Sequence, residues 1–213
     1  MTRILFVFLF TATLTITALS QIQNQPENAP VCSLSLSQAP AIRGIRLGMK
    51  PDEWLKLFPG SAQDEKIKAI LDEPPNYPRY GVKDITFFPS NSQNQFNYLP
   101  REEFSGIASV SLTLFDNQII GISISYARYP DMGNPWDDVA QLITIFSETF
   151  NLPQVSAWNK TVARAVLKCA GFELILDVNN RPLAYLNSQF DFRQIIRQRA
   201  EADKQKGRAA FKP

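Results

Sequence analysis

The chain contains no histidine among its 213 residues. Histidine is the commonest general base and the commonest metal ligand near neutral pH, so its absence removes both roles at once. Serine–histidine–aspartate triads, cysteine–histidine pairs and histidine-based zinc sites are therefore excluded. The sequence also lacks an Asp-x-Asp calcium loop, a glycine-rich phosphate-binding loop and a Cys-x-x-Cys pair. It thus gives no support for a metal, nucleotide or redox-catalyst function, and we expect no cofactor.

The first 20 residues have the composition of an export signal. Arg3 precedes the apolar stretch Ile4–Leu14, which is too short to anchor the chain across a bilayer, and small residues stand at the third and first positions before the expected cut. We predict that residues 1–20 are removed and that the mature protein begins near Gln21. It should then work outside the cytoplasm, in the periplasm or as a secreted protein.

Cysteine is almost absent, since only Cys32 and Cys169 are present. An even count in an oxidising compartment indicates one disulfide between them, with two free thiols as the alternative. The residues before Cys32, 28–31, lack the Leu-x-x pattern of a lipoprotein cleavage site. We therefore expect no lipid anchor.

Acidic residues are scarce at the C-terminal end. From Arg193 onward seven basic residues face only Glu201 and Asp203, whereas residues 21–192 carry a net charge of −4. This basic tail would be attracted to anionic lipid headgroups or nucleic acid, or it is a solvated helix end whose cations complement the helix dipole. Because no aromatic residue interleaves with the charges from Arg193 to Arg208, we expect at most weak contact with anionic membranes and no nucleic-acid binding.

The order of the segments predicts two similar units after an arm. Residues 21–40 are polar and rich in proline, which predicts an extended arm held at Cys32. A first helix-plus-sheet unit covers 41–130, a second covers 131–190, and 191–213 form a C-terminal helix and basic tail. The predicted fold class is α+β, with helices packed on one face of an antiparallel sheet and two tandem helix-plus-hairpin units.

Proline and acidic residues mark the start of the first helix. Pro51 suits the first helical position, and Asp52 and Glu53 complement the positive end of the helix dipole. A second short helix is predicted over 64–71. The apolar residues of the first helix are Trp54, Leu55 and Phe58, and Pro59-Gly60 ends it.

A long irregular segment, 72–106, follows these helices, and only Val82–Phe88 within it has the pattern of a strand. Irregular segments of this length inside a domain are uncommon and are often binding loops. The segment carries four aromatic candidates for partner binding; alternatively, these rings hold the loop against its own sheet. The candidates are Tyr77, Tyr80, Phe96 and Tyr98.

Apolar alternation over 110–114 and 120–126 predicts a hairpin around residues 116–118. A three-residue loop sets Leu114 opposite Ile120 and Leu112 opposite Ile122, which keeps the apolar side chains on one face. We therefore predict the three-residue loop.

The second unit begins with a predicted helix, for which Asn134 is the expected N-cap and Pro135 the first residue. Its apolar side chains recur at spacings of three and four residues. They are Trp136, Val139, Ile143, Phe146 and Phe150, and Leu152-Pro153 closes the helix.

The following hairpin is the most strongly determined local structure. A two-residue turn at Ala170-Gly171 sets Lys168 opposite Glu173 and Arg164 opposite Asp177, two pairs of opposite charge on one face, and leaves Cys169 on the core face. A second turn at Asn179-Asn180 is predicted to return Leu183 to Leu176 and Tyr185 to Leu174. Pro182 indicates that this last strand is an edge.

The C-terminal helix should be capped by Asp191. Its apolar anchor is expected to be Phe192, Ile195 and Ile196. After Ile196 the face of the helix becomes polar, so the helix should project into solvent and fray near Gly207.

The starts of the two units are alike and suggest an internal duplication: Gly48-Met49-Lys50-Pro51-Asp52-Glu53-Trp54 corresponds to Gly133-Asn134-Pro135-Trp136-Asp137-Asp138-Val139. Residues 45–53, together with Phe58-Pro59-Gly60, resemble the strand-Gly-Met-helix segment of small exported BamE/SmpA-like and beta-lactamase-inhibitor-protein-like domains. The resemblance implies helices on one face of an antiparallel sheet and a binding role in envelope assembly or enzyme inhibition. No functional residue can be carried over from it.

The leading hypothesis is an exported, non-catalytic protein-interaction module whose partner is another envelope or secreted protein. One alternative is a hydrolase that uses an acidic pair, for which Asp52-Glu53, Glu102-Glu103 and Asp137-Asp138 are the candidates. The first and last of these pairs lie in predicted first helical turns, where they have a structural explanation. A further alternative is a structural envelope protein without a dedicated ligand.

Overall fold

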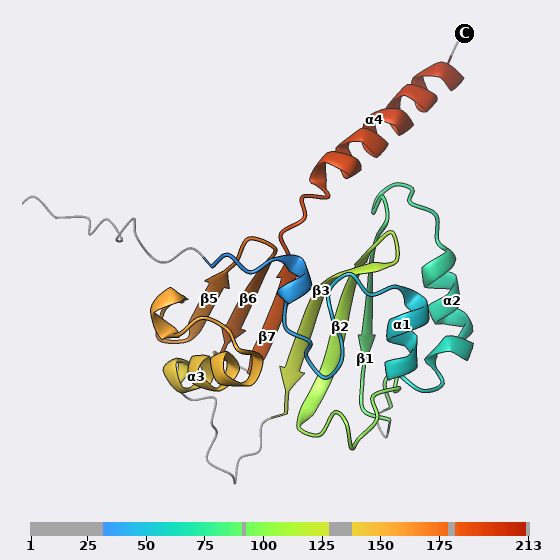
Figure 1. Ribbon diagram of the computed structural model, residues 1–213. Helices are drawn as coiled ribbons and strands as arrows, with labels where there is room; N and C mark the ends of the chain where they lie inside the picture. Colours follow the sequence, from blue (N-terminus) through green and yellow to red (C-terminus); the bar gives the residue numbers. More distant parts are fainter. Residues whose placement is uncertain (1–31, 91–92, 128–137, 179–181, 212–213) are drawn as a thin grey trace, which may run out of the picture.

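One antiparallel sheet of seven strands runs through the described part of the chain, in the order β1-β2-β3-β7-β6-β5-β4 (Figure 1). The computed structural model describes residues 32–90, 93–127, 138–178 and 182–211. The predicted signal peptide, Asn134, Pro135 and the Asn179-Asn180 turn lie outside these residues. The strands are β1 Val82–Phe87, β2 Ile107–Phe115, β3 Gln118–Tyr126, β4 Asn159–Lys160, β5 Arg164–Lys168, β6 Phe172–Asp177 and β7 Leu183–Ser188.

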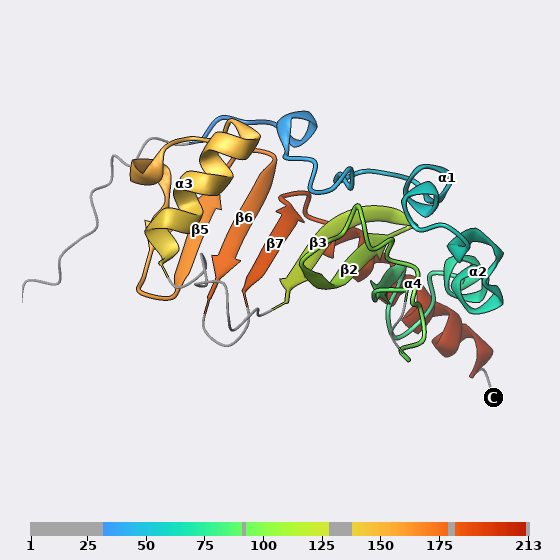
Figure 2. The ribbon, with the colours of Figure 1, turned by 90° about the horizontal axis from the view of Figure 1, so that it is seen from below.

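Helices α1, α2 and α3 lie on one face of this sheet, as the sequence predicts for an α+β fold (Figure 2). Short 3-10 turns connect them to the strands. The α-helices are α1 Pro51–Trp54, α2 Glu65–Asp72, α3 Val139–Phe150 and α4 Arg193–Ala210, and the 3-10 turns are η1 Leu36–Gln38, η2 Leu55–Leu57, η3 Ser61–Gln63 and η4 Val155–Ala157.

Aspartate side chains cap the starts of α2 and α3. The Asp64 carboxylate accepts from the backbone N–H groups of Lys66 and Ile67 and so caps α2. Helix α3 starts later than predicted, at Val139, where Asp138 is the N-cap and accepts from the Ala140 N–H at 2.8 Å.

The core lies between the helices and the sheet and is rich in aromatic rings under the first unit. Phe58 and Phe87 stack with ring centroids 4.0 Å apart, and Trp54 and Phe104 contact Phe58. Residues Ile45, Leu47 and Met49 are buried there too, but they lie in irregular chain, where Ile45 forms only an isolated bridge with Ile42, and not in a strand. The strand that the resemblance implies at the start of this segment is therefore not formed.

The β2–β3 hairpin corrects the predicted three-residue loop. Phe115 pairs with Gln118 around a two-residue turn, and Asp116 and Asn117 have the positive φ angles that such turns require. A register shift between Thr113 and Leu114 leaves Ile120 unpaired, so that Leu112 still faces Ile122 as predicted. With a two-residue turn alone, Ile122 would face the opposite side of the sheet. The bulge at Ile120 returns Ile122 to the core face.

The β5–β6 hairpin confirms the register predicted from the two charge pairs, with Lys168 opposite Glu173 and Arg164 opposite Asp177. In contrast, the predicted register of β7 is wrong by one residue. Ala184 faces Leu176 and Leu186 faces Leu174, and these two β7 side chains are buried. Leu183 and Tyr185 therefore point to the opposite face of the sheet.

Strand β7 is central and not an edge, which corrects the interpretation of Pro182. Pro182 lies just before the strand, where its carbonyl accepts from the Tyr126 N–H, so it costs no ladder donor. Strands β3 and β7, each the last strand of its unit, pair antiparallel and join the units into one sheet.

The N-terminal segment 32–49 crosses both units (Figure 1). It is tied to the β5–β6 turn by the Cys32–Cys169 disulfide and by a hydrogen bond from the Gly171 N–H to Leu34 O. A side chain at Gly171 would lie 2.0 Å from the Leu36 nitrogen, so only glycine fits. At its other end the segment exchanges hydrogen bonds with Ile119 of β3.

Candidate functional site

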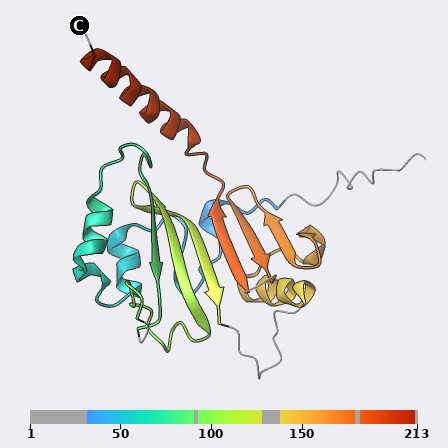
Figure 3. The same ribbon diagram turned by 180° about the vertical axis from the view of Figure 1, so that it is seen from behind.

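The face of the sheet opposite α1, α2 and α3 is here called the open face. Figure 2 shows α3 and the N-terminal segment above the sheet, with no described helix below β5, β6 and β7, and Figure 3 views these strands from that side. Strand alternation places Thr86, Ser111 and Ser123 on this face, and the Thr86 and Ser111 hydroxyl oxygens lie 2.9 Å apart. This is the composition expected of a sheet surface that faces water.

The row of cross-strand neighbours that contains these three residues changes from polar to apolar where the first unit meets the second. Ser123 pairs with Tyr185, which pairs with Ile175, which pairs with Val166. Leu183 lies two residues along β7 on the same face, and all four apolar side chains are only partly buried. We call Val166, Ile175, Leu183 and Tyr185 the apolar patch.

Charged side chains border the apolar patch at both ends of the strands. On one side Lys168 and Glu173 approach to 3.7 Å, and on the other Arg164 is directly opposite Asp177. An apolar centre with a charged rim is the usual anatomy of a protein-binding surface. The sequence contained a signal for this patch, because Val166 and Ile175 occupy the same face as the charge pairs that set the register.

The four predicted aromatic candidates form two separate groups at opposite ends of β1. Tyr77 and Tyr80 contact each other edge to face before β1, and Tyr77 is 78% exposed. Phe96 and Tyr98 follow β1 and pack against the core, with Phe96 beside Phe87. Segment 72–106 thus does not bring the four rings together, and among them Tyr77 offers the most surface.

Tyr98 is held by a carboxylate at the start of α2. Its hydroxyl donates to Asp64 Oδ2 at 2.7 Å. Burial raises the pKa of Asp64, but the hydrogen bonds from Tyr98 and two backbone N–H groups outweigh it, so the net pKa is lowered. The hydrogen bond to Asp64 raises the pKa of Tyr98. This pair therefore has a structural role in fixing the 96–99 segment on α2.

Two cations that the sequence did not single out connect distant elements. Lys83 is buried on the core face and donates to Leu71 O at the end of α2 and to Asn117 Oδ1 in the β2–β3 turn. Burial lowers the pKa of Lys83 despite the nearby carboxylates of Glu73, Asp116 and Asp72. Arg199 holds α4 to the β2–β3 turn. Both depend on long-range pairing, so no local sequence pattern could have found them.

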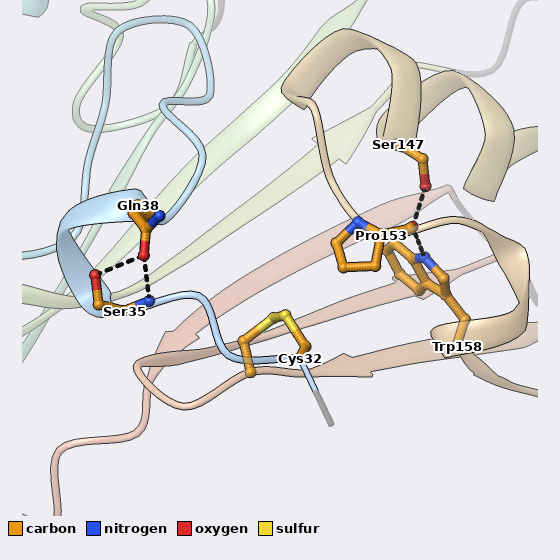
Figure 4. Close-up of a disulfide and its surroundings, with 7 residues drawn as sticks. Cys32, Ser35, Gln38, Ser147, Pro153 and Trp158 are labelled. Carbon is orange, nitrogen blue, oxygen red and sulfur yellow. Dashed lines mark hydrogen bonds between the residues drawn. A yellow bond between two sulfur atoms is a disulfide. The ribbon is translucent and has the colours of Figure 1, made fainter. Parts of the chain in front are cut away.

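The disulfide is present as predicted, with Cys32 and Cys169 buried and 137 residues apart in sequence. Figure 4 shows the disulfide between the turn that contains Ser35 and Gln38 and the segment that contains Pro153 and Trp158. The carbonyl oxygen of Pro153 accepts from Ser147 Oγ and from Trp158 Nε1. A cleft of about 370 Å³ adjoins Cys32. Its lining contains no charged side chain.

The candidate acidic pairs have structural partners or face solvent. Glu53 accepts from the Lys50 N–H and Asp138 caps α3, while Glu102 and Glu103 are exposed. Asp137 lies outside the described residues. Across the described ranges, no group of three or more Asp, Glu or Cys residues could hold a metal ion.

Comparisons with known proteins give no relative: no protein-family model matches the chain, and no curated protein or solved structure is significantly similar to it. In the part of the chain that the structure describes, no helix has both the length and the apolar character needed to cross a membrane.

Proposed function

We propose that the protein is an exported, non-catalytic interaction module that binds another envelope or secreted protein through the open face of β5, β6 and β7. The observation that carries the proposal is the contrast within one row of the sheet. Thr86, Ser111 and Ser123 occupy the row in the first unit, whereas Tyr185, Ile175 and Val166 occupy it in the second. Apolar side chains gathered on an uncovered face mark interaction sites.

Export is supported by two independent features. The N-terminal 20 residues have the pattern of a signal peptide, and the Cys32–Cys169 disulfide is of a kind that persists in oxidising compartments. The capping roles of Glu53 and Asp138 account for these acidic residues without catalysis.

Photo-crosslinking in the exported fraction of expressing cells tests this function. A photoreactive amino acid at position 175 should capture a protein, because Ile175 lies at the centre of the apolar patch. The same amino acid at position 111 is the matched control, since Ser111 occupies the same row and face on β2. Equal capture from positions 111 and 175, or none from 175, would reject the open face of β5–β7 as the binding surface.

A further inference from the structure

Charges on the open face are sorted by strand in the second unit. Both charged side chains of β5 on this face, Arg164 and Lys168, are positive, and both of β6, Glu173 and Asp177, are negative. Each positive residue is directly opposite a negative one across the hairpin. Each charged residue of β5 on this face is therefore opposite a β6 residue of the other sign.

We infer that the apolar patch packs against the same patch of a second copy of this chain, around a two-fold axis that runs parallel to the strands between β5 and β6. Such an axis exchanges β5 of one copy with β6 of the other at equal height. Arg164 then faces Asp177 of the second copy, and Lys168 faces its Glu173. The inference rests on the proposed function, because it names the protein that occupies the proposed surface.

The apolar residues obey the same exchange. Val166 and Ile175 are paired across the hairpin, so the axis sets Val166 over Ile175 of the second copy at the centre of the contact. The next strands outward, β4 and β7, also exchange, which sets Tyr185 over Asn159 of the second copy, where the tyrosine hydroxyl meets an amide. Two-fold symmetry makes each contact occur twice.

Other positions of the axis lose this complementarity. An axis between β6 and β7 would set Lys168 over Gly121 and Glu173 over Asn187, since those residues share one row. The charges of β5 and β6 would then face no opposite charge in the second copy. Charge matching thus selects the axis between β5 and β6. It also favours a second copy as the partner, because a two-fold rotation about this axis sets the positive residues of β5 against the negative residues of β6 in the other copy.

In the described part of the chain, no helix covers this surface (Figures 2 and 3). Helix α3 covers β5 and β6 from the opposite face, and α4 leaves the sheet beside the β2–β3 turn, away from β4 and β5 (Figures 1 and 2). Aligned sheets pack within about 30° of each other, which keeps rows near the axis in register. Strands β5, β6 and β7, about 4.8 Å apart with faces of about five residues at about 3.3 Å per residue, give roughly 240 Å² per copy.

This contact is smaller than the ~800 Å² per partner of stable complexes, so the association should be weak and reversible. Protein recovered from the exported fraction is examined by sedimentation velocity over a range of concentrations, from about 5 to about 500 µM, that brackets a weak dissociation constant. The weight-average mass should rise toward twice the monomer mass. A monomer at every concentration would overturn the inference.

Charge reversal provides the specific test. The half-reversed variant, Arg164→Asp with Lys168→Glu, places like charges both within the hairpin and across the axis and should not self-associate. The fully exchanged variant adds Glu173→Lys and Asp177→Arg, which restores all pairs within the hairpin and across the axis, so it should fold and self-associate like the unaltered protein.

Mixing the fully exchanged variant with the unaltered protein then distinguishes this interface from any other. Across the proposed axis, β5 of one would face a like-charged β6 of the other, so each should pair only with itself, with mixed dimers at least several-fold below the statistical share. Free mixing would show that dimers form through another surface and would overturn the inference. If the protein does not self-associate but still captures another protein from position 175, the inference of a second copy is overturned and the proposed function stands.

Discussion

Arg199 of α4 donates to both carboxylate oxygens of Asp116 in the β2–β3 turn, at 2.8 and 2.7 Å. The same guanidinium donates to Tyr80 O and lies over the ring of Phe115, which also stacks on Phe192. Helix α4 is helical through Gly207 and ends at Ala210, beyond the predicted fraying point. The predicted anchor of Phe192, Ile195 and Ile196 is therefore incomplete without Arg199.

We predict that truncation after Ile196 leaves a folded protein that is about 1–2 kcal/mol less stable than the full chain, because a partly exposed bidentate ion pair and a cation–π contact are lost. Truncation after Ala200 retains Arg199 and should cost less than half of that. Urea denaturation of both proteins measures the difference. Equal stability of the two truncated proteins would show that the Arg199 contacts contribute nothing.

Removal of the disulfide should have a larger effect. Replacing Cys32 and Cys169 by serine opens a loop that spans 137 residues of sequence separation. The chain-entropy model gives about 4–5 kcal/mol for a loop of this length, as an upper estimate. Urea denaturation checks the loss, and mass spectrometry of the unaltered protein should show no alkylation before reduction. A loss below about 1 kcal/mol would mean that the N-terminal segment is held by its other contacts.

The Tyr98–Asp64 hydrogen bond should make stability depend on pH in the acid range. Asp64 has a lowered pKa in the folded state, so its stabilising effect is present above its unfolded pKa of about 4 and is lost as pH falls through the folded pKa. Tyr98→Phe removes one bond to the charged carboxylate and should cost about 1 kcal/mol at pH 7.

The cost of Tyr98→Phe should shrink as the pH is lowered below about 4, because a protonated Asp64 accepts more weakly. Urea denaturation between pH 3 and pH 7 measures this trend. Tyr77→Phe is the control, since Tyr77 is exposed and its ring contacts Tyr80, and its effect should be small at every pH. A Tyr98→Phe cost that is the same across this range would contradict the role of Asp64.

The β-bulge makes an unusual deletion tolerable. Removing Ile120 from β3 leaves a regular hairpin in which Leu114 still faces Ile119 and Leu112 still faces Ile122. We predict a folded protein with a melting temperature within a few degrees of the unaltered one, as seen by thermal denaturation with circular dichroism. Deleting Ser123 instead moves Ile124 out of the core and should unfold the protein. Similar damage from both deletions would contradict the bulge.

The parts of the fold that were predictable are those in which both faces of a strand carry a pattern. In β5 and β6 the charge pairs and the apolar residues require the same register, so the two-residue turn at Ala170-Gly171 followed from sequence. In β7, two sets of alternate residues are apolar and either set could face the core. One set is Leu183 and Tyr185, and the other is Ala184 and Leu186. Pairing with β3, whose partner residues stand 58 to 66 positions earlier in the chain, selects the second set, and no local pattern indicates this pairing.

The candidate site was only partly accessible from sequence. Val166 and Ile175 could have been recognised as apolar residues on a charged face, but Tyr185 joins them only when β7 has its observed register. The aromatic residues of segment 72–106 are candidates on the basis of composition alone. Composition cannot distinguish Tyr77, which faces solvent, from Tyr98, whose hydroxyl is bound to Asp64.

Hydroxyl-radical footprinting of Tyr185 tests the binding surface most directly, with Tyr77 as an internal reference on the same chain. Labelling is compared between dilute purified protein and the protein in its native exported fraction. The account predicts that Tyr185 is labelled several-fold less in the native fraction, because a bound protein covers the apolar patch, while labelling of Tyr77 stays unchanged. Equal labelling of Tyr185 in both samples would contradict an interaction through the open face of β5–β7.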